Sequence, residues 1–234
     1  MASKADTKSK NDELEISEQI GEFIQKNRRV FVIGLIAVIV ILVGFIVVNT
    51  VRDKILSNAL SKVDSFSRRY DELKSYIGSE DPETLLKQAE VFILLEELSD
   101  FEGKNSGFAA ARAYDISGNI YADQKNWAQA EEAWSNAAKV AAKSYLAPIT
   151  LYNAAVAAEE QGNTDSAIAL YTRVLEYGNS FPSAPRAQFS IGRLEESRNN
   201  IDAAVEAYRK LLSRWPGDPV WPNLAQSRIL VIAE

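Results

Sequence analysis

One uninterrupted apolar run, Val30 to Val48, constrains this chain more than any other feature. Sixteen of its nineteen residues are Val, Ile, Leu or Phe, the other three are Gly or Ala, and none is charged. As a helix the run would rise about 29 Å at about 1.5 Å per residue, close to the thickness of a bilayer core. Soluble helices are rarely apolar on every side, so a buried core helix is disfavoured. We predict a transmembrane anchor over residues 30–51.

A cleaved signal peptide is the main alternative for this run. Signal peptides have a shorter apolar region, about 7–15 residues, followed by a small-residue cleavage site. The run is longer than that, and the four residues after it, Asn49 to Arg52, contain no Ala-x-Ala pattern. We therefore predict that the anchor stays attached.

Basic residues decide the predicted orientation only in part. They nearly balance, with Lys26, Arg28 and Arg29 before the run and Arg52, Lys54 and Lys62 after it. Short flanks follow the positive-inside rule, whereas long domains translocate largely regardless of charge. We predict a single-pass protein of the inner (cytoplasmic) membrane, in contact with the lipid bilayer through its anchor. Residues 1–29 then form a cytoplasmic, partly disordered tail, and the C-terminal domain is periplasmic or otherwise outside the cytoplasm.

Residues 52–107 are predicted to form a linker helix and a degenerate first helix pair. Apolar residues alternate at spacings of three and four from Leu56 to Ile77, which is a heptad seam. The seam allows self-association as a coiled coil, or packing on the next helix of the same chain, which we favour. That next helix, about Pro82 to Asp100, is expected to be buried because Val91 to Leu95 are all apolar.

A period of 37 residues organises the remainder of the chain. Pro148, Pro185 and Pro222 are equally spaced, and further columns align when the period is counted from Ala111. The eighth position is always small, the twentieth is always Ala and the twenty-fourth is always aromatic. These columns are Gly118, Ala155 and Gly192; Ala130, Ala167 and Ala204; and Trp134, Tyr171 and Tyr208. Such spacing predicts helix pairs that cross at small residues, with aromatic rings between adjacent pairs.

This pattern resembles the tetratricopeptide repeat, whose usual period is 34 residues. The resemblance implies an all-α fold in which the single transmembrane helix precedes an α-solenoid of helix-turn-helix pairs. The domain over 108–234 would contain three repeats, about 111–147, 148–184 and 185–221, and a closing helix over 222–234. A generic helical bundle is the alternative, but the aligned columns disfavour it.

The same resemblance implies a concave groove lined by the first helix of each pair. Carried over by position, the candidate residues for peptide binding are Arg112, Asp115, Asn119, Tyr152, Val156, Arg186, Phe189 and Arg193. They mix basic and aromatic groups, which suits a peptide or helix with an acidic component. Some members of the family grip a C-terminal carboxylate with a basic clamp. Asp115 and Ser190 stand where that clamp needs basic residues, so we do not predict it.

Composition argues against catalysis, cofactors and nucleic acid. The chain has no Cys and no His, which removes thiol nucleophiles, Ser/His pairs and common zinc sites. A net charge of −6 disfavours a nucleic-acid partner. Adjacent glutamates, such as Glu159 and Glu160, point about 100° apart on a helix and do not converge on a ligand. We predict no enzyme, no metal and no cofactor.

The whole layout is similar to the YfgM-like family of bacterial membrane proteins. The resemblance rests on the segment Ile20 to Arg29, the single anchor and the repeats. It implies an adaptor that assists protein export or folding beside the Sec translocon, with translocon subunits, periplasmic chaperones or envelope proteins as partners. The alternative is a structural or assembly scaffold of the envelope. Such a scaffold would oligomerise through Leu56 to Ile77, as in Tol–Pal-associated repeat proteins.

Overall fold

The computed structural model describes residues 21, 23, 25–79 and 81–232. The secondary-structure elements among these residues are all helices, joined by turns and loops. The predicted cytoplasmic tail as far as residue 20 lies outside the described residues. The chain divides into two units, residues 1–57 and 58–234.

The apolar run belongs to helix α2, which extends over Arg28–Leu73. The large apolar side chains of the run are exposed on every side of the helix, with exposed fractions from 49% at Val32 to 69% at Ile41. Among the described residues, this is the one helix that is long and apolar enough to cross a membrane. Because the run is not covered by the described part of the chain, it lacks the burial that a soluble core helix would have.

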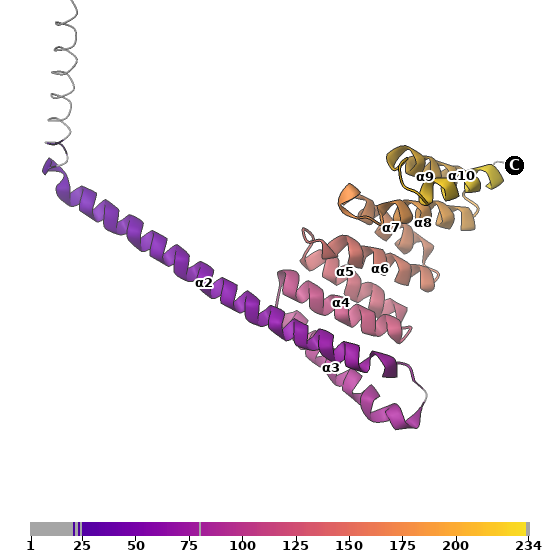
Figure 1. The fold of residues 1–234 in the computed structure, drawn as a ribbon, viewed down its shortest axis with the longest axis horizontal. Helices are drawn as coiled ribbons and strands as arrows, with labels where there is room; N and C mark the ends of the chain where they lie inside the picture. The colour runs from indigo at the N-terminus through magenta and orange to yellow at the C-terminus, as the bar shows by residue number, and fades with distance from the viewer. Residues whose placement is uncertain (1–20, 22, 24, 80, 233–234) are drawn as a thin grey trace, which may run out of the picture. The chain divides into compact units, whose positions relative to one another are not determined.

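The second unit is a row of helices arranged as successive antiparallel pairs (Figure 1). The helix α4 packs on α5, α6 on α7 and α8 on α9, and neighbouring pairs meet through α5 with α6 and α7 with α8. The helix bounds are α3 Leu85–Lys104, α4 Gly107–Asp123, α5 Trp127–Val140, α6 Leu146–Glu160, α7 Thr164–Leu175, α8 Ala184–Ser197, α9 Ile201–Arg214 and α10 Trp221–Ile232. Short 3-10 turns lie at Lys74–Tyr76, Pro82–Thr84 and Gly178–Ser180.

Each turn inside a helix pair contains one residue in the left-handed backbone region. These residues are Lys125 with φ 57°, Gly162 with φ 73° and Asn199 with φ 61°. An asparagine follows in each case and is the N-cap of the second helix. In the first repeat a lysine adopts the left-handed backbone that Gly or Asn adopts in the other two. This conformation is less favourable for lysine, because its Cβ crowds the backbone.

The repeat columns form the core between the helices. Ala130, Ala167 and Ala204 are fully buried, as expected of residues at helix crossings. The aromatic column is also buried, and its rings lie directly on the small eighth residue of their own repeat: Trp134 meets Gly118 and Tyr208 meets Gly192. The prediction that these rings sit between adjacent pairs was therefore incomplete, because they also separate the two helices of one pair.

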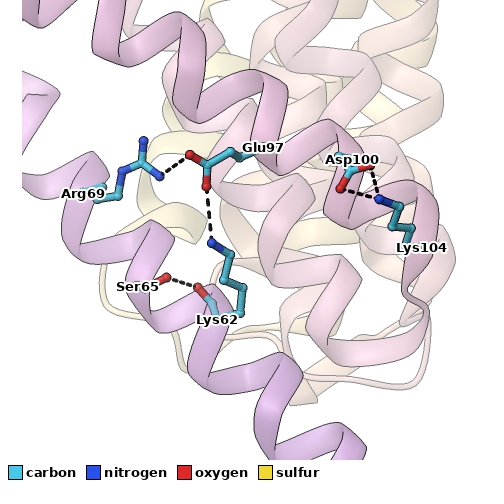
Figure 2. A network of polar contacts seen from close by, with 6 residues as sticks. All are labelled: Lys62, Ser65, Arg69, Glu97, Asp100 and Lys104. Carbon is cyan, nitrogen blue, oxygen red and sulfur yellow. Dashed lines mark hydrogen bonds and ion pairs between the residues drawn. The ribbon is translucent and has the colours of Figure 1, made fainter.

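The end of α2 packs within its own chain. Four residues of the heptad seam, Val63, Phe66, Tyr70 and Leu73, are buried in a cluster with side chains of α3 and α4. Figure 2 shows the polar side of this contact, where the Glu97 carboxylate accepts hydrogen bonds from Arg69 at 2.8 Å and Lys62 at 3.3 Å. These seam residues contact helices of the same molecule, so their packing needs no second copy.

The expectation that α3 is buried along Val91 to Leu95 was wrong for two residues. Val91 and Leu94 are buried, but Phe92 is 67% and Ile93 is 51% exposed. Successive side chains on a helix point about 100° apart, so partners on one side cannot cover all of them. The opposite side of α3 thus presents apolar groups that the described residues leave uncovered.

Candidate peptide-binding groove

The eight predicted groove residues lie on the first helices of the three pairs. Arg112, Asp115 and Asn119 are on α4, Tyr152 and Val156 are on α6, and Arg186, Phe189 and Arg193 are on α8. Their spacing of three or four residues places each group on one side of its helix. Five of the eight meet around one hollow, and the three on α4 do not.

This hollow has a volume of about 300 Å³. Tyr152, Val156, Arg186, Phe189 and Arg193 line it from α6 and α8. The indole of Trp221, the first residue of α10, lines it as well. A second hollow of about 370 Å³ shares Phe189 and Arg193 and reaches Arg228 on α10. The two hollows together form an open surface over the second and third repeats.

Aromatic rings build one wall of the hollow. Tyr152 packs edge-on against the core residue Tyr171, with ring centroids 5.3 Å apart. Phe189 contacts the core residue Tyr208 at 5.3 Å and Trp221 at 5.4 Å. The buried column aromatics therefore fix the rings that face the groove. A rigid aromatic wall loses little conformational entropy when an apolar side chain binds to it.

Arg186 lies at the edge of this wall. Its guanidinium carbon is 5.4 Å from the ring centre of Tyr152 and 6.0 Å from that of Trp221, both within the range of cation–π contact. The side chain is exposed, and none of the ion pairs between described residues includes it. Arg186 thus places a positive charge beside the aromatic pocket without a carboxylate to neutralise it.

Arg193 is held differently, because it pairs with Glu159 of the preceding repeat. The same carboxylate accepts a hydrogen bond from the hydroxyl of Tyr171 at 2.6 Å. Burial, together with this bond, raises the pKa of Tyr171 well above its usual value. The three residues link two neighbouring repeats, and the charge of Arg193 is already balanced.

The next repeat carries a matching set of contacts. Glu196 accepts hydrogen bonds from Tyr208 at 3.0 Å and from Arg228. Burial and this bond raise the pKa of Tyr208 to about 12, and the Arg228 guanidinium lowers the pKa of Glu196. In the first repeat, the corresponding glutamate position is Ala122 and the aromatic is Trp134, so this polar link is missing there.

The three predicted groove residues on α4 have other surroundings. Arg112 pairs with Asp64 of α2 at 2.6 Å. Asp115 is partly buried, and burial raises the pKa of its carboxyl to about 6, a rise opposed by the nearby Trp134 indole and Arg112 guanidinium. The buried Trp134 Nε1 has no hydrogen-bond partner of normal geometry among the described residues, so we assign the indole only a weak effect. The charge of Arg112 is thus balanced by Asp64, and the three α4 residues do not line the hollow.

The sequence analysis did not choose five further residues that line the hollow, Glu159, Glu160, Tyr171, Ser190 and Trp221. Trp221 immediately precedes Pro222 of the closing helix. Glu159 lies three residues after Val156, the last groove residue chosen in the second repeat. The 37-residue period could have identified Glu159, because Glu196 occupies the same position one repeat later. Nothing in the sequence pattern predicts Trp221, since its place depends on how α10 packs.

The arrangement has binding groups but lacks a metal site in the part of the chain that the structure describes. No three acidic side chains converge there in a way that could hold a cation. Three half-buried aromatic rings and a guanidinium without an ion-pair partner among the described residues line this open hollow.

Comparison with known proteins identifies the repeats. Residues 109–180 and residues 152–219 each match a family model described as the tetratricopeptide repeat. A TPR repeat-containing protein of Treponema pallidum (strain Nichols) is 38% identical over 127 residues. That match covers 54% of this chain and 52% of the relative, so this chain spans about half the length of the protein it resembles.

Proposed function

Since residues 109–219 form tetratricopeptide repeats, we propose that this protein is a membrane-anchored adaptor that binds other proteins through its second and third repeats. Tetratricopeptide repeats mediate protein–protein interactions. The observation that carries the proposal is the hollow of about 300 Å³, around which Tyr152, Phe189 and Arg186 gather from two repeats. These groups are the aromatic and arginine anchors that dominate binding energy at protein interfaces.

We infer that the apolar run holds this adaptor at a membrane. The run from Val30 to Val48 is apolar on all sides and uncovered by the described residues, which supports insertion into a bilayer. The N-terminus is then cytoplasmic and the repeats are periplasmic, because a short basic flank stays inside more readily than a long domain.

The chain contains no cysteine. A single Cys at the exposed Ala169 should therefore react with a membrane-impermeant maleimide once the outer membrane is permeabilised. Labelling only after inner-membrane lysis would show the opposite orientation, with the repeats in the cytoplasm.

The resemblance of the segment Ile20 to Arg29, the single anchor and the repeats to the YfgM-like family supports an adaptor that acts beside the Sec translocon. Its partners would be translocon subunits and periplasmic chaperones, and its role would be to assist export or folding. Support is indirect: a single anchor keeps the repeats close to segments that emerge from the membrane. The packing of Val63, Phe66 and Tyr70 against α3 and α4 also favours an adaptor. A coiled-coil scaffold would need the same side chains for a second copy.

The decisive experiment is photo-crosslinking in cells with a photoreactive amino acid at Val156, inside the groove. The matched control carries the same amino acid at Ala169, which is exposed on α7 away from the hollow. Translocon subunits or periplasmic chaperones trapped at Val156 and absent at Ala169 would support the export adaptor. Recovery of this protein alone, or of outer-membrane assembly proteins, would favour the scaffold.

A second test removes the aromatic wall. Replacing Tyr152 and Phe189 together by Ser should abolish the crosslink from Val156. The Tyr152 ring contacts the core residue Tyr171, and the Phe189 ring contacts the core residue Tyr208. Helicity and thermal unfolding of the variant must therefore be measured in parallel. A folded variant that still crosslinks to the same partner would place the binding site on another surface.

A further inference from the structure

The charges on the groove are distributed unevenly between paired and unpaired arginines. Arg193 pairs with Glu159, Arg228 pairs with Glu196, and Arg112 pairs with Asp64. Arg186 lines the same hollow as Arg193, yet no carboxylate among the described residues pairs with it. The positive potential of the hollow therefore concentrates at one guanidinium.

Resting on the proposed function, we propose that the partner segment carries a carboxylate next to a large apolar side chain. The carboxylate binds Arg186, and the apolar side chain enters the pocket formed by Tyr152, Phe189 and Trp221. The partner is thus defined by two groups that bind the same hollow, a carboxylate and an apolar side chain. The partner segment needs neither a free C-terminus nor a helical conformation.

The contacts of Arg186 leave its hydrogen-bonding groups available. The guanidinium lies over the rings of Tyr152 and Trp221 and forms no hydrogen bond or ion pair with another described residue. The N–H donors lie in the plane of the group, so its edge remains open to a carboxylate in a bidentate arrangement. The two rings also restrict the side chain before binding, which reduces the entropy lost when a ligand is held.

The hollow has a size that suits one apolar side chain. Its volume of about 300 Å³ is at the lower end of the range for ligand pockets. Tyr152, Phe189 and Trp221 provide its aromatic surface, with Val156 beside them. An aromatic or large aliphatic side chain would bury its surface against these rings and exclude water from the adjoining ion pair.

The acidic residues that line the hollow explain why only one carboxylate is expected. Glu159 is neutralised by Arg193, and Glu160 is exposed without an ion-pair partner among the described residues. A second acidic group close to Glu160 would be repelled by it. The partner sequence should therefore combine its apolar residue with a single acidic neighbour directed at Arg186.

The test uses the full-length protein in detergent micelles and fluorescein-labelled peptides of about ten residues. The probe has one Phe-Asp pair in a Gly/Ser background, and three matched peptides have Phe-Asn, Phe-Lys or Ala-Asp instead. Fluorescence anisotropy at low salt should show that Phe-Asp binds about fivefold to tenfold tighter than Phe-Asn and Ala-Asp. Phe-Lys should bind weakest.

Variants then assign this preference to one residue. Arg186→Gln should remove the difference between Phe-Asp and Phe-Asn, and Arg186→Lys should keep only part of it. The matched control is Arg209→Gln, an exposed arginine on α9 that lies outside the hollow and causes the same change in net charge. It should leave the preference intact.

Three results would overturn the inference. These are equal binding of Phe-Asp and Phe-Asn, an unchanged preference in Arg186→Gln, and no peptide binding while the Val156 crosslink still captures a partner. In all three cases the adaptor function would survive, because the crosslink tests it separately. Absence of both peptide binding and groove crosslinks would refute the two proposals together.

Discussion

The ring of Tyr208 lies against the backbone of Gly192 with no room for a side chain between them. A Cβ placed on Gly192 would come within 2.5 Å of Tyr208 Cε1 and 2.7 Å of its Cδ1. The first repeat has the same relationship, where a Cβ on Gly118 would lie 2.6 Å from Trp134. In the second repeat the small residue is Ala155 and the ring is Tyr171. The small eighth residue thus sets how closely the two helices of a pair approach.

Gly192→Ala should destabilise the domain because Tyr208 is fully buried and cannot move aside freely. We expect a loss of about 1–3 kcal/mol in the free energy of unfolding, as is typical of overpacked cores. The measurement is chemical unfolding of the full-length protein in micelles, followed by circular dichroism. The control is Gly103→Ala in α3, where a Cβ meets nothing within 4 Å. Alanine should be neutral or stabilising there, because it forms helix more readily than glycine.

Ala167→Trp should disrupt the crossing inside the second helix pair. Ala167 is fully buried in the main core cluster, so a large side chain must displace α6 or α7. The expected cost is about 1–3 kcal/mol or more. Ala169→Trp, at an exposed position of the same helix, controls for the change in helix propensity. Equal melting of the two variants would show that the repeat register is wrong.

Tyr171→Phe should weaken the contact between α6 and α7 inside the second repeat without opening a cavity. The substitution removes only the hydroxyl that donates to Glu159 at 2.6 Å. We expect a loss of about 1–2 kcal/mol, since the carboxylate would lose a partner in a partly buried site. Tyr145→Phe, which alters an exposed tyrosine, should leave unfolding unchanged. A similar effect of both substitutions would mean that the hydroxyl of Tyr171 contributes little.

Asp115 should make stability depend on pH between about 4 and 6. Burial raises the pKa of Asp115 to about 6 in the folded state, from 3.8 in the unfolded state. The folded protein therefore binds more protons in this interval, and the stability contribution of the protonated carboxyl is lost as pH rises through 6. Asp115→Asn should remove this dependence and raise stability at pH 7 by roughly 1 kcal/mol or more.

Unfolding curves of wild type and Asp115→Asn at pH 4 and pH 7.5 measure the effect. Asp71→Asn, at an exposed carboxylate of α2, is the control and should retain the wild-type dependence. If the two variants respond to pH in the same way, Asp115 is ionised as easily as a surface carboxylate and its environment is more polar than the structure indicates.

Periodic features of the fold were predictable because they repeat. The three alanines at the twentieth position and the aromatics at the twenty-fourth are buried as their columns predict. The equal spacing of Pro148, Pro185 and Pro222 predicts three repeats. The φ value of Lys125 was not predictable in this way, since its side chain carries no preference for the left-handed region.

The candidate groove was predicted in part. Position in the repeat selected Tyr152, Phe189 and Arg186, and these three residues line one hollow in the structure. It could not separate Arg186 from Arg112, because both are basic residues at the second position of a repeat. Their difference depends on Asp64, which lies 48 residues away from Arg112 in the chain and next to it in the fold.

The sequence by itself determined the apolar helix, the repeat period and the residue types on each helix, because these depend on local order and spacing. Only the tertiary structure decided which charges remain unpaired and which rings face a hollow. Asp64 neutralises Arg112, Glu159 neutralises Arg193, and Trp221 completes the pocket beside Arg186. The physical reason is that ion pairing and aromatic contact act over a few ångströms in space. Helices distant in sequence must pack before the partners of a side chain are set.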